Sequence, residues 1–164
     1  MSKFKNKPNP DNRSNNVRKI QKLIQKTEIE IISMVKMTVQ KVLSNYKVGD
    51  KVGILATKGA LATELYQREL NQFDIPFIIH SDQEIEHEFM PAVYSVKRNE
   101  IKKAGVIFQD LSQRLVQAGA SSIILACTEI PLGLHAIHSP ILNISFDTTQ
   151  ILADACIDWY YHRR

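Results

Sequence analysis

Hydrophobic and polar positions follow two alternating spacings along most of this 164-residue chain. Short apolar runs typical of buried strands occur at Lys51–Ala56, Ile75–Ile79, Ser122–Ala126 and Pro140–Ser145. Between these runs, apolar residues recur every three or four positions, a spacing that predicts helices over Leu61–Asn71, Arg98–Ala118 and Thr149–Tyr161. Alternating strands and helices predict an α/β domain, with a four-stranded parallel sheet covered by helices on both faces.

Helix-capping residues support this interpretation at two places. Ser81 and Glu84 have the spacing of a capping box, in which each side chain binds the backbone amide of the other residue. The helix that follows is expected to bury one face, formed by Ile85, Phe89 and Val93. Gly119 is predicted to end the helix that precedes the Ser122–Ala126 strand.

The first 45 residues have a different pattern. Residues 1–16 contain almost no apolar side chains, which predicts a disordered basic tail. Apolar residues at helical spacing begin at Val17, and the domain is expected to comprise residues 17–164, including this N-terminal helical extension. One long helix from Val17 to Asn45, or two helices with a break near Thr27, fit the pattern. The apolar stripe of such a helix would need a partner, which suggests a homo-oligomer.

Composition limits the class of protein. An apolar content of 44% is enough for a hydrophobic core, and no run of about 18 apolar residues suggests a membrane span. The polar, basic N-terminus does not have the features of a secretory signal. Cys127 and Cys156 form no disulfide framework, so we expect a reduced, cytoplasmic protein.

The net charge of +4 is concentrated at the N-terminus. Residues 1–28 carry eight Lys or Arg against Asp11 and Glu28, whereas the remainder has a small negative charge. Aromatic residues, which often alternate with basic ones in nucleic-acid sites, are absent from this segment apart from Phe4. A solvated arm is therefore predicted, and no nucleic-acid partner is expected.

The segment Ser121–Leu132, with the sequence SSIILACTEIPL, combines a strand with reactive side chains. Cys127, Thr128 and Glu129 follow the strand directly. In parallel α/β sheets, ligands bind beyond the carboxyl ends of the strands, so a thiol, a hydroxyl and a carboxylate reach the functional edge together. The spacing alone equally fits a small buried cysteine at a strand end.

Three motifs resemble the cofactor-independent aspartate/glutamate racemases. Gly119-Ala120 followed by Cys127-Thr128-Glu129 resembles the second cysteine motif of that family. Lys51–Ala60, KVGILATKGA, resembles its Ala-Thr-x-Gly-Thr loop, and Ile29–Met34, IEIISM, resembles its Ile-Pro-Ile-Ile-Ser-Met segment. The resemblance runs from about Ile29 to the C-terminus and covers the C-terminal half of the usual two-domain protein. It implies a single Rossmann-like or flavodoxin-like α/β domain and no cofactor.

The resemblance implies amino-acid racemisation by cysteine acid/base chemistry. Such an enzyme needs two proton-transferring groups, one on each face of the substrate α-carbon. In the family these groups are two cysteines, one from each domain, and Cys127 matches the second. Thr128 matches a residue that binds the substrate carboxylate. If Thr128–Leu132 begins a helix turn whose amides point at the sulfur, that turn would lower the pKa of the Cys127 thiol.

Other positions are assigned by the same resemblance. Thr57, Gly59 and Glu129 are expected to contribute to substrate binding, although the second threonine of the Ala-Thr-x-Gly-Thr loop is Ala60 here. Lys97 matches a lysine that attracts the side-chain carboxylate of aspartate, and a solvated surface lysine is the alternative. An aspartate follows the last strand in the family, but helix capping explains Asp147 equally well.

No counterpart of the first cysteine domain, with its Cys-Asn-Thr motif, occurs in the sequence, and Cys156 is interpreted as a small core residue. The domain is therefore expected to be incomplete, and inactive unless another chain or a swapped dimer supplies the missing half. Its partners would be a small amino acid or dicarboxylate. The alternatives are a non-catalytic carboxylate-binding or dimerisation module and a single-cysteine decarboxylase of malonate-type acids. His135 and His138 are a weak metal signal, and no metal site is expected.

Overall fold

The computed structural model describes residues 31–162. Nearly all of them lie in the second of two compact units, Ile32–Arg164. The predicted tail over residues 1–16 and the predicted helix before residue 31 lie outside the described residues.

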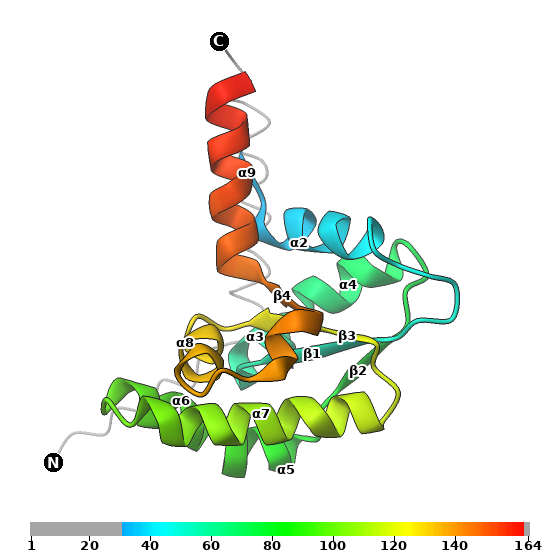
Figure 1. Cartoon of the computed structure of the whole chain (residues 1–164). Coiled ribbons are helices and arrows are strands. Elements are labelled where there is room, and N and C mark those ends of the chain that lie inside the picture. The colour runs from blue at the N-terminus through cyan, green and yellow to red at the C-terminus, as the bar shows by residue number, and fades with distance from the viewer. Residues whose placement is uncertain (1–30, 163–164) are drawn as a thin grey trace, which may run out of the picture. The chain divides into compact units, whose positions relative to one another are not determined.

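Four parallel strands form the central sheet of this unit, as the sequence predicts (Figure 1). They are β1 (Val52–Ala56), β2 (Phe77–Ile79), β3 (Ser122–Ala126) and β4 (Ser145–Asp147), arranged in the order β2-β1-β3-β4. The central pair β1 and β3 is in register from Val52 opposite Ser122 to Ala56 opposite Ala126. The two strands therefore end at the same level, and the residues that follow them lie at one edge of the sheet.

Helices connect the strands and cover both faces of the sheet (Figure 1). The α-helices are α2 (Met34–Leu43), α3 (Lys58–Thr63), α4 (Leu65–Asn71), α5 (Asp82–Glu84), α6 (Met90–Lys97), α7 (Ile101–Gln117), α8 (Glu129–Ala136) and α9 (Thr148–His162). A π-helical turn, η1 (Ile85–Phe89), joins α5 to α6, and a 3-10 helix, η2 (Pro140–Ile144), precedes β4. In Figure 1, α6 and α7 lie below the sheet, whereas α2 and α4 lie above it.

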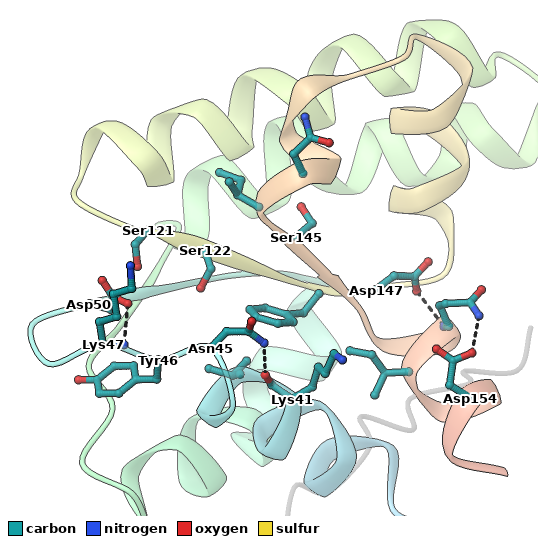
Figure 2. Close-up of a pocket in the computed structure, with 16 residues that line it drawn as sticks. Lys41, Asn45, Tyr46, Lys47, Asp50, Ser121, Ser122, Ser145, Asp147 and Asp154 are labelled. Atoms are coloured by element: carbon teal, nitrogen blue, oxygen red, sulfur yellow. Dashed lines mark hydrogen bonds between the residues drawn. The ribbon is translucent and has the colours of Figure 1, made fainter. Parts of the chain in front are cut away.

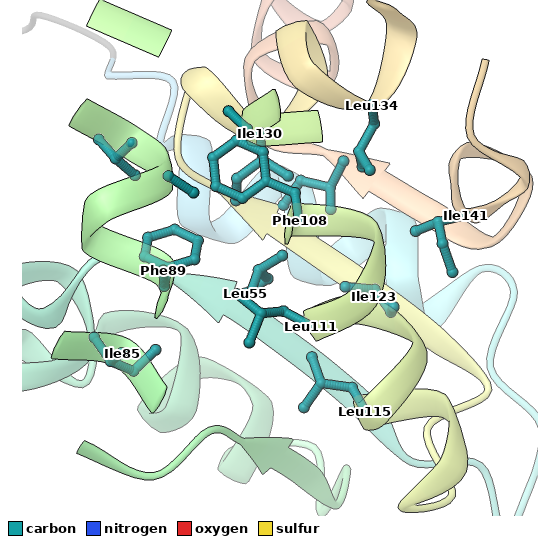
Figure 3. Close-up of a cluster of buried hydrophobic side chains, with 14 of the residues drawn as sticks. Leu55, Ile85, Phe89, Phe108, Leu111, Leu115, Ile123, Ile130, Leu134 and Ile141 are labelled. Carbon is teal, nitrogen blue, oxygen red and sulfur yellow. The ribbon is translucent and has the colours of Figure 1, made fainter. Parts of the chain in front are cut away.

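The core divides into two layers because strand side chains alternate between the faces of the sheet. Leu55 of β1 and Ile123 and Leu125 of β3 pack with η1, α6, α7 and α8 (Figure 3). Phe89 of η1 and Phe108 of α7 are fully buried there. Val52, Ile54 and Ala56, together with Ile124, pack against α2 and α4 on the other face. Burial of both strand faces explains why β1 and β3 appear in the sequence as continuous apolar runs.

Helices α7 and α8 cross with almost no space between their backbones. A methyl group added at Gly105 would lie 2.2 Å from the carbonyl oxygen of Gly133. Glycine at Gly105 therefore allows the close approach that holds α8, and the Cys127 segment before it, against the core.

The predicted caps are confirmed. The Ser81 hydroxyl accepts from the Glu84 amide, and the Glu84 carboxylate accepts from the Ser81 amide at 2.9 Å. Ile85, Phe89 and Val93 are buried together behind this cap. Gly119 adopts a φ of +102°, the left-handed conformation expected of a glycine just after a helix.

Two predicted elements are wrong in type or continuity. Pro140–Ser145 is not a strand, because Ser139 caps a 3-10 turn with Pro140 at its first position, and pairing with β3 begins only at Ser145. The predicted helix over Leu61–Asn71 is interrupted at Glu64, which has a left-handed φ of 53°.

Three other boundaries also differ. The predicted helix over Arg98–Ala118 begins only at Ile101, since Asn99 has a φ of 65° and ends the preceding turn. The second strand begins at Phe77, after Pro76. A single helix from Val17 to Asn45 is wrong, because residues 31–33 are not helical and Ser33, with extended backbone, caps α2.

Candidate functional site

The end of β3 and the end of β1 form a shared edge. Ala56 pairs with Ala126, so Thr57 and Cys127, the next residue of each chain segment, emerge at the same level of the sheet. Thr57 begins the turn into α3, and Cys127 lies two residues before α8. Lys97, the last residue of α6, reaches this edge from one face of the sheet.

Cys127 is half-buried and holds a defined hydrogen bond. Its Sγ donates to Glu129 Oε2 at 2.9 Å. Burial raises the pKa of the Cys127 thiol to about 12, and the hydrogen bond to the Glu129 carboxylate adds to this increase. The same bond lowers the pKa of Glu129, so the pair consists of a thiol and a carboxylate at neutral pH.

This geometry corrects the expectation of a lowered thiol pKa. Helix α8 does begin just after Cys127, but its first residue is Glu129. The Glu129 carboxylate turns back onto the sulfur, and a negative charge there opposes thiolate formation. Glu129, expected to bind substrate, has one oxygen occupied by the thiol.

Thr128 and Lys97 complete the group around this carboxylate. The exposed Thr128 hydroxyl donates to Glu129 Oε2 at 2.9 Å. Lys97 Nζ lies 3.9 Å from Glu129 Oε1, with 61% of its side chain exposed. It also lies 5.9 Å from the centre of the Tyr94 ring. The structure therefore brings together four of the six predicted site residues.

Thr57 and Gly59 lie on the adjacent loop and have other structural roles. The Thr57 hydroxyl accepts from the Ala60 amide at 3.2 Å and so caps α3. Gly59 is exposed, and a Cβ there would meet no atom within 4 Å. Within residues 31–162, no hydrogen bond connects either residue with Cys127.

Two further sequence interpretations are tested at other positions. Cys156 is exposed on α9, so its interpretation as a core residue is wrong: it faces away from the side of the helix that packs on the domain. Asp147 accepts from the amides of Thr149 and Gln150 at 2.9 and 3.3 Å, which is the capping role that the sequence left open.

A cleft of about 650 Å³ lies elsewhere, along the outer edge of β4 (Figure 2). Lys41, Asn45 and Tyr46 border it on one side, and Asp147 and Asp154 border it on the other. Some of the polar groups that line the cleft form hydrogen bonds with one another. The Asp50 carboxylate, for example, accepts from the Lys47 amide at 2.9 Å. None of the six site residues predicted from the sequence lines this cleft, so we place the candidate site at the Cys127 edge.

Within the part of the chain that the structure describes, no group of three or more His, Cys, Asp or Glu side chains is arranged so that it could hold a metal ion. No helix within residues 31–162 is long and apolar enough to span a bilayer.

Sequence reasoning missed two contacts. The Cys127–Glu129 bond depends on the turn between strand and helix, although the two-residue spacing was a signal that the side chains could meet. The Thr57 cap could have been found from a threonine placed directly before the helix-forming segment Lys58–Thr63.

Comparison with known proteins places this chain in a family. The Asp/Glu/Hydantoin racemase family model matches residues 15–156. The chain belongs to this family. A curated but uncharacterised protein from the pnlA 3′ region of Pectobacterium carotovorum is 30% identical over 139 residues, which cover 85% of this chain and 91% of that protein.

Other relatives are longer than the matched region. A glutamate racemase of Deinococcus radiodurans is 32% identical over 80 residues, or 49% of this chain and 27% of that enzyme. An aspartate racemase homologue from Pyrococcus horikoshii OT3 superposes with a TM-score of 0.70 and 19% identity, over 85% of this chain and 60% of that one. The fold is therefore shared, and this chain spans only part of either protein.

Proposed function

We propose that the Cys127 edge is one half of an amino-acid racemase site, in which Cys127 exchanges a proton with the α-carbon of a small dicarboxylic amino acid. The observation that carries this proposal is the 2.9 Å hydrogen bond between Cys127 Sγ and Glu129, at the end of a central strand of a racemase-family domain. A defined thiol at the ligand-binding end of a parallel sheet is suited to acid/base chemistry.

The protonation state of Cys127 indicates whether it would give or take a proton at neutral pH. A thiol with a pKa of about 12 is protonated at neutral pH, so it is ready to donate. In this step the S–H bond breaks, a C–H bond forms on the substrate carbanion, and the sulfur becomes a thiolate. The reverse step returns the proton to sulfur. Either step serves one face of the α-carbon only.

The group for the opposite face is proposed to come from another domain or chain. Cys156, the other cysteine, lies on α9, two turns beyond the start of that helix. A second copy of the Cys127 site would bring another thiol with a raised pKa, and such a thiol is a poor base. A partner with a more acidic thiol would complement Cys127 better.

Lys97 supports a substrate with a second carboxylate. Its ammonium group is mostly exposed and lies 3.9 Å from Glu129, so it borders the site without being neutralised in a tight pair. A side-chain carboxylate of aspartate would find a cation there, and the Thr128 hydroxyl could donate to the α-carboxylate if its proton turned away from Glu129.

Proton NMR in deuterated water tests the proposal with the full chain at pH 9, in separate samples of L-aspartate and D-aspartate. We expect slow loss of the α-proton signal from one enantiomer without formation of the other, because one acid/base group exchanges the proton on one face. Cys127→Ser should abolish this exchange, and Cys156→Ser is the matched control that should retain it. Exchange that persists in Cys127→Ser, or no exchange above background in the natural chain, contradicts the proposal. Accumulation of D-aspartate would contradict the half-site.

One observation favours a second candidate, the decarboxylation of a malonate-type acid. That reaction needs a single protonating thiol: carbon dioxide leaves, and the resulting carbanion takes the proton of Cys127. The raised thiol pKa suits this role. Release of carbon dioxide from phenylmalonate, lost in Cys127→Ser, would support it. Binding of L-aspartate without either reaction would instead indicate a carboxylate-binding module.

A further inference from the structure

The donors of the Cys127 edge point at a carboxylate that belongs to the chain itself. The Cys127 thiol and the Thr128 hydroxyl both donate to Glu129 Oε2 at 2.9 Å. Lys97 Nζ, from α6, lies 3.9 Å from the other carboxylate oxygen, Oε1. Only 19% of the Glu129 side chain is exposed. The end of α6 and the start of α8 therefore enclose one carboxylate at the edge of the sheet.

These contacts hold Glu129 as an anion. The hydrogen bond from Cys127 is the main cause that lowers the pKa of the Glu129 carboxyl, and burial opposes it. The Thr128 hydroxyl, the Glu129 amide and the charge of Lys97 lower the pKa further. A carboxylate that receives several hydrogen bonds beside a cation has the surroundings that proteins provide for a bound acid. Glu129 therefore makes the contacts that the carboxylate of a ligand would need at this edge.

We propose that Glu129 is an internal competitor, which occupies Thr128 and Lys97 until the carboxylate of a small acid takes these two contacts. This role rests on the proposed function for the place of the ligand, and not for proton transfer by Cys127. Glu129 and a ligand carboxylate are both negative, and like charges that share a site repel each other. The charge of Glu129 therefore weakens the binding of small mono- and dicarboxylic acids at this edge.

The two contacts that the ligand would take are the ones that exchange most easily. Thr128 is exposed, and its hydroxyl proton turns about a single bond. The Lys97 side chain is 61% exposed, and its distance of 3.9 Å from Glu129 exceeds that of a hydrogen bond. The bond from the half-buried Cys127 can persist while these two change. Ile130 is fully buried and holds the start of α8, so ligand entry needs side-chain movements only.

Titration of the full chain, labelled with nitrogen-15, with succinate tests the competition. Succinate is aspartate without its amino group, so its binding is measured apart from any α-proton exchange. The shift of the Thr128 amide signal at constant ionic strength gives the dissociation constant. Glu129→Ala should lower this constant about tenfold relative to the natural chain, because one like charge is removed from the site.

Glu69→Ala, on the surface of α4, is the matched control that removes the same charge elsewhere. It should keep the dissociation constant within about twofold of the natural value, since exposed charges far from a ligand are screened. Three outcomes would overturn the proposal: a decrease of less than about threefold in Glu129→Ala, an equal decrease in Glu69→Ala, or no binding of succinate by the Glu129→Ala chain.

A second pair of variants checks where succinate binds. In the Glu129→Ala chain, Lys97→Gln should raise the dissociation constant about fivefold, because the cation that faces the ligand is lost. Lys36→Gln removes an exposed lysine from α2 and should leave the constant within about twofold. Succinamide, which has the same carbon chain without the charges, should not bind. Equal effects of the two lysine substitutions, or equal binding of succinamide, would overturn the proposal.

Circular dichroism verifies that Glu129→Ala keeps its fold. If it does not, Glu129→Gln, which keeps the side-chain length and removes the charge, is titrated in its place with the same expected decrease. The result is separate from that of the proposed function. Tighter succinate binding by Glu129→Ala without α-proton exchange of aspartate would reject the racemase half-site alone. Exchange without tighter binding would reject the competitor role alone.

Discussion

At the scale of single residues, the candidate site is defined by one carboxylate. Glu129 accepts hydrogen bonds from Cys127 and Thr128, and its other oxygen faces Lys97. The Cys127 thiol is therefore held by the residue two positions later rather than activated by the helix N-terminus. This arrangement keeps the Cys127 thiol protonated at neutral pH, so that in the proposed reaction Cys127 would donate a proton and Glu129 would position it.

Glu129→Gln should make Cys127 more reactive, because the carboxylate is one of the two main causes of the raised thiol pKa. Each unit by which the thiol pKa falls increases the thiolate fraction about tenfold. The thiolate also becomes about threefold less nucleophilic for each unit, so the net rate rises about threefold. We therefore expect alkylation by iodoacetamide at pH 8, in a Cys156→Ser background, to become about threefold faster per unit. Glu69→Gln, on the surface of α4, should leave the rate unchanged. An alkylation rate in Glu129→Gln that is equal to or slower than that of the natural chain would show that Glu129 does not raise the pKa of the Cys127 thiol.

At the scale of elements, the helices and strands that the sequence predicted correctly are those that depend on interactions between residues close together in the chain. The β3 strand was predicted with its observed bounds, because Ile123–Leu125 form a run that only a buried strand accommodates well. The capping box at Ser81 was also predicted, since both partners lie within one turn. Residues 140–144 were misread as a strand because Ile141 is apolar and buried in either conformation, and only pairing with β3 distinguishes the two.

Glu84→Gln should remove a pH-dependent part of the stability of this helix start. Hydrogen bonds from Ser81 are the main cause that lowers the pKa of Glu84 to about 2. A lowered carboxyl pKa stabilises the folded state above the unfolded pKa of about 4.3, and this contribution is lost as pH falls towards 2. At pH 7 we expect Glu84→Gln to cost about 1 kcal/mol, as a lost cap does.

Urea unfolding at several pH values would measure this effect. The difference between Glu84→Gln and the natural chain should shrink as pH falls from about 4.5 to about 2. Glu69→Gln again provides a surface control, with little difference at any pH. A difference that stays constant across this range would show that the carboxylate charge is not what stabilises the turn.

The crossing of α7 and α8 yields a prediction with a matched pair of glycines. Gly105→Ala would place a methyl group 2.2 Å from the Gly133 carbonyl oxygen, and overpacking of this kind costs about 1–3 kcal/mol. Gly59→Ala enters open space in α3, where alanine favours the helix by up to about 1 kcal/mol. Thermal unfolding followed by circular dichroism should therefore move the two melting temperatures in opposite directions. Equal shifts would contradict the close approach.

At the scale of the whole molecule, the sequence predicted the sheet and the place of Cys127, but not the surroundings of either cysteine. Parallel pairing of the strands and the position of the functional edge follow from the alternation of strands and helices along the chain, whereas the strand order comes from the structure. The exposure of Cys156 was missed because Ala155 and Ile157 flank it, and both are apolar. Such neighbours look the same whether a helix faces a core or a partner, and only the packing of α9 on α2 decides between them.

The proposed half-site should act within a single chain. The Cys127 group is built from α6, the end of β3 and the start of α8, all of one chain. If the chain exchanges the α-proton of aspartate, we expect the rate per chain to stay constant within about twofold as the protein is diluted. The comparison is made in the deuterium-exchange assay, with light scattering at the same concentrations to measure the mass of the particle. A rate per chain that falls as the mass falls would mean that a second copy contributes to the Cys127 site, and the missing acid/base group would then have to be sought in that assembly.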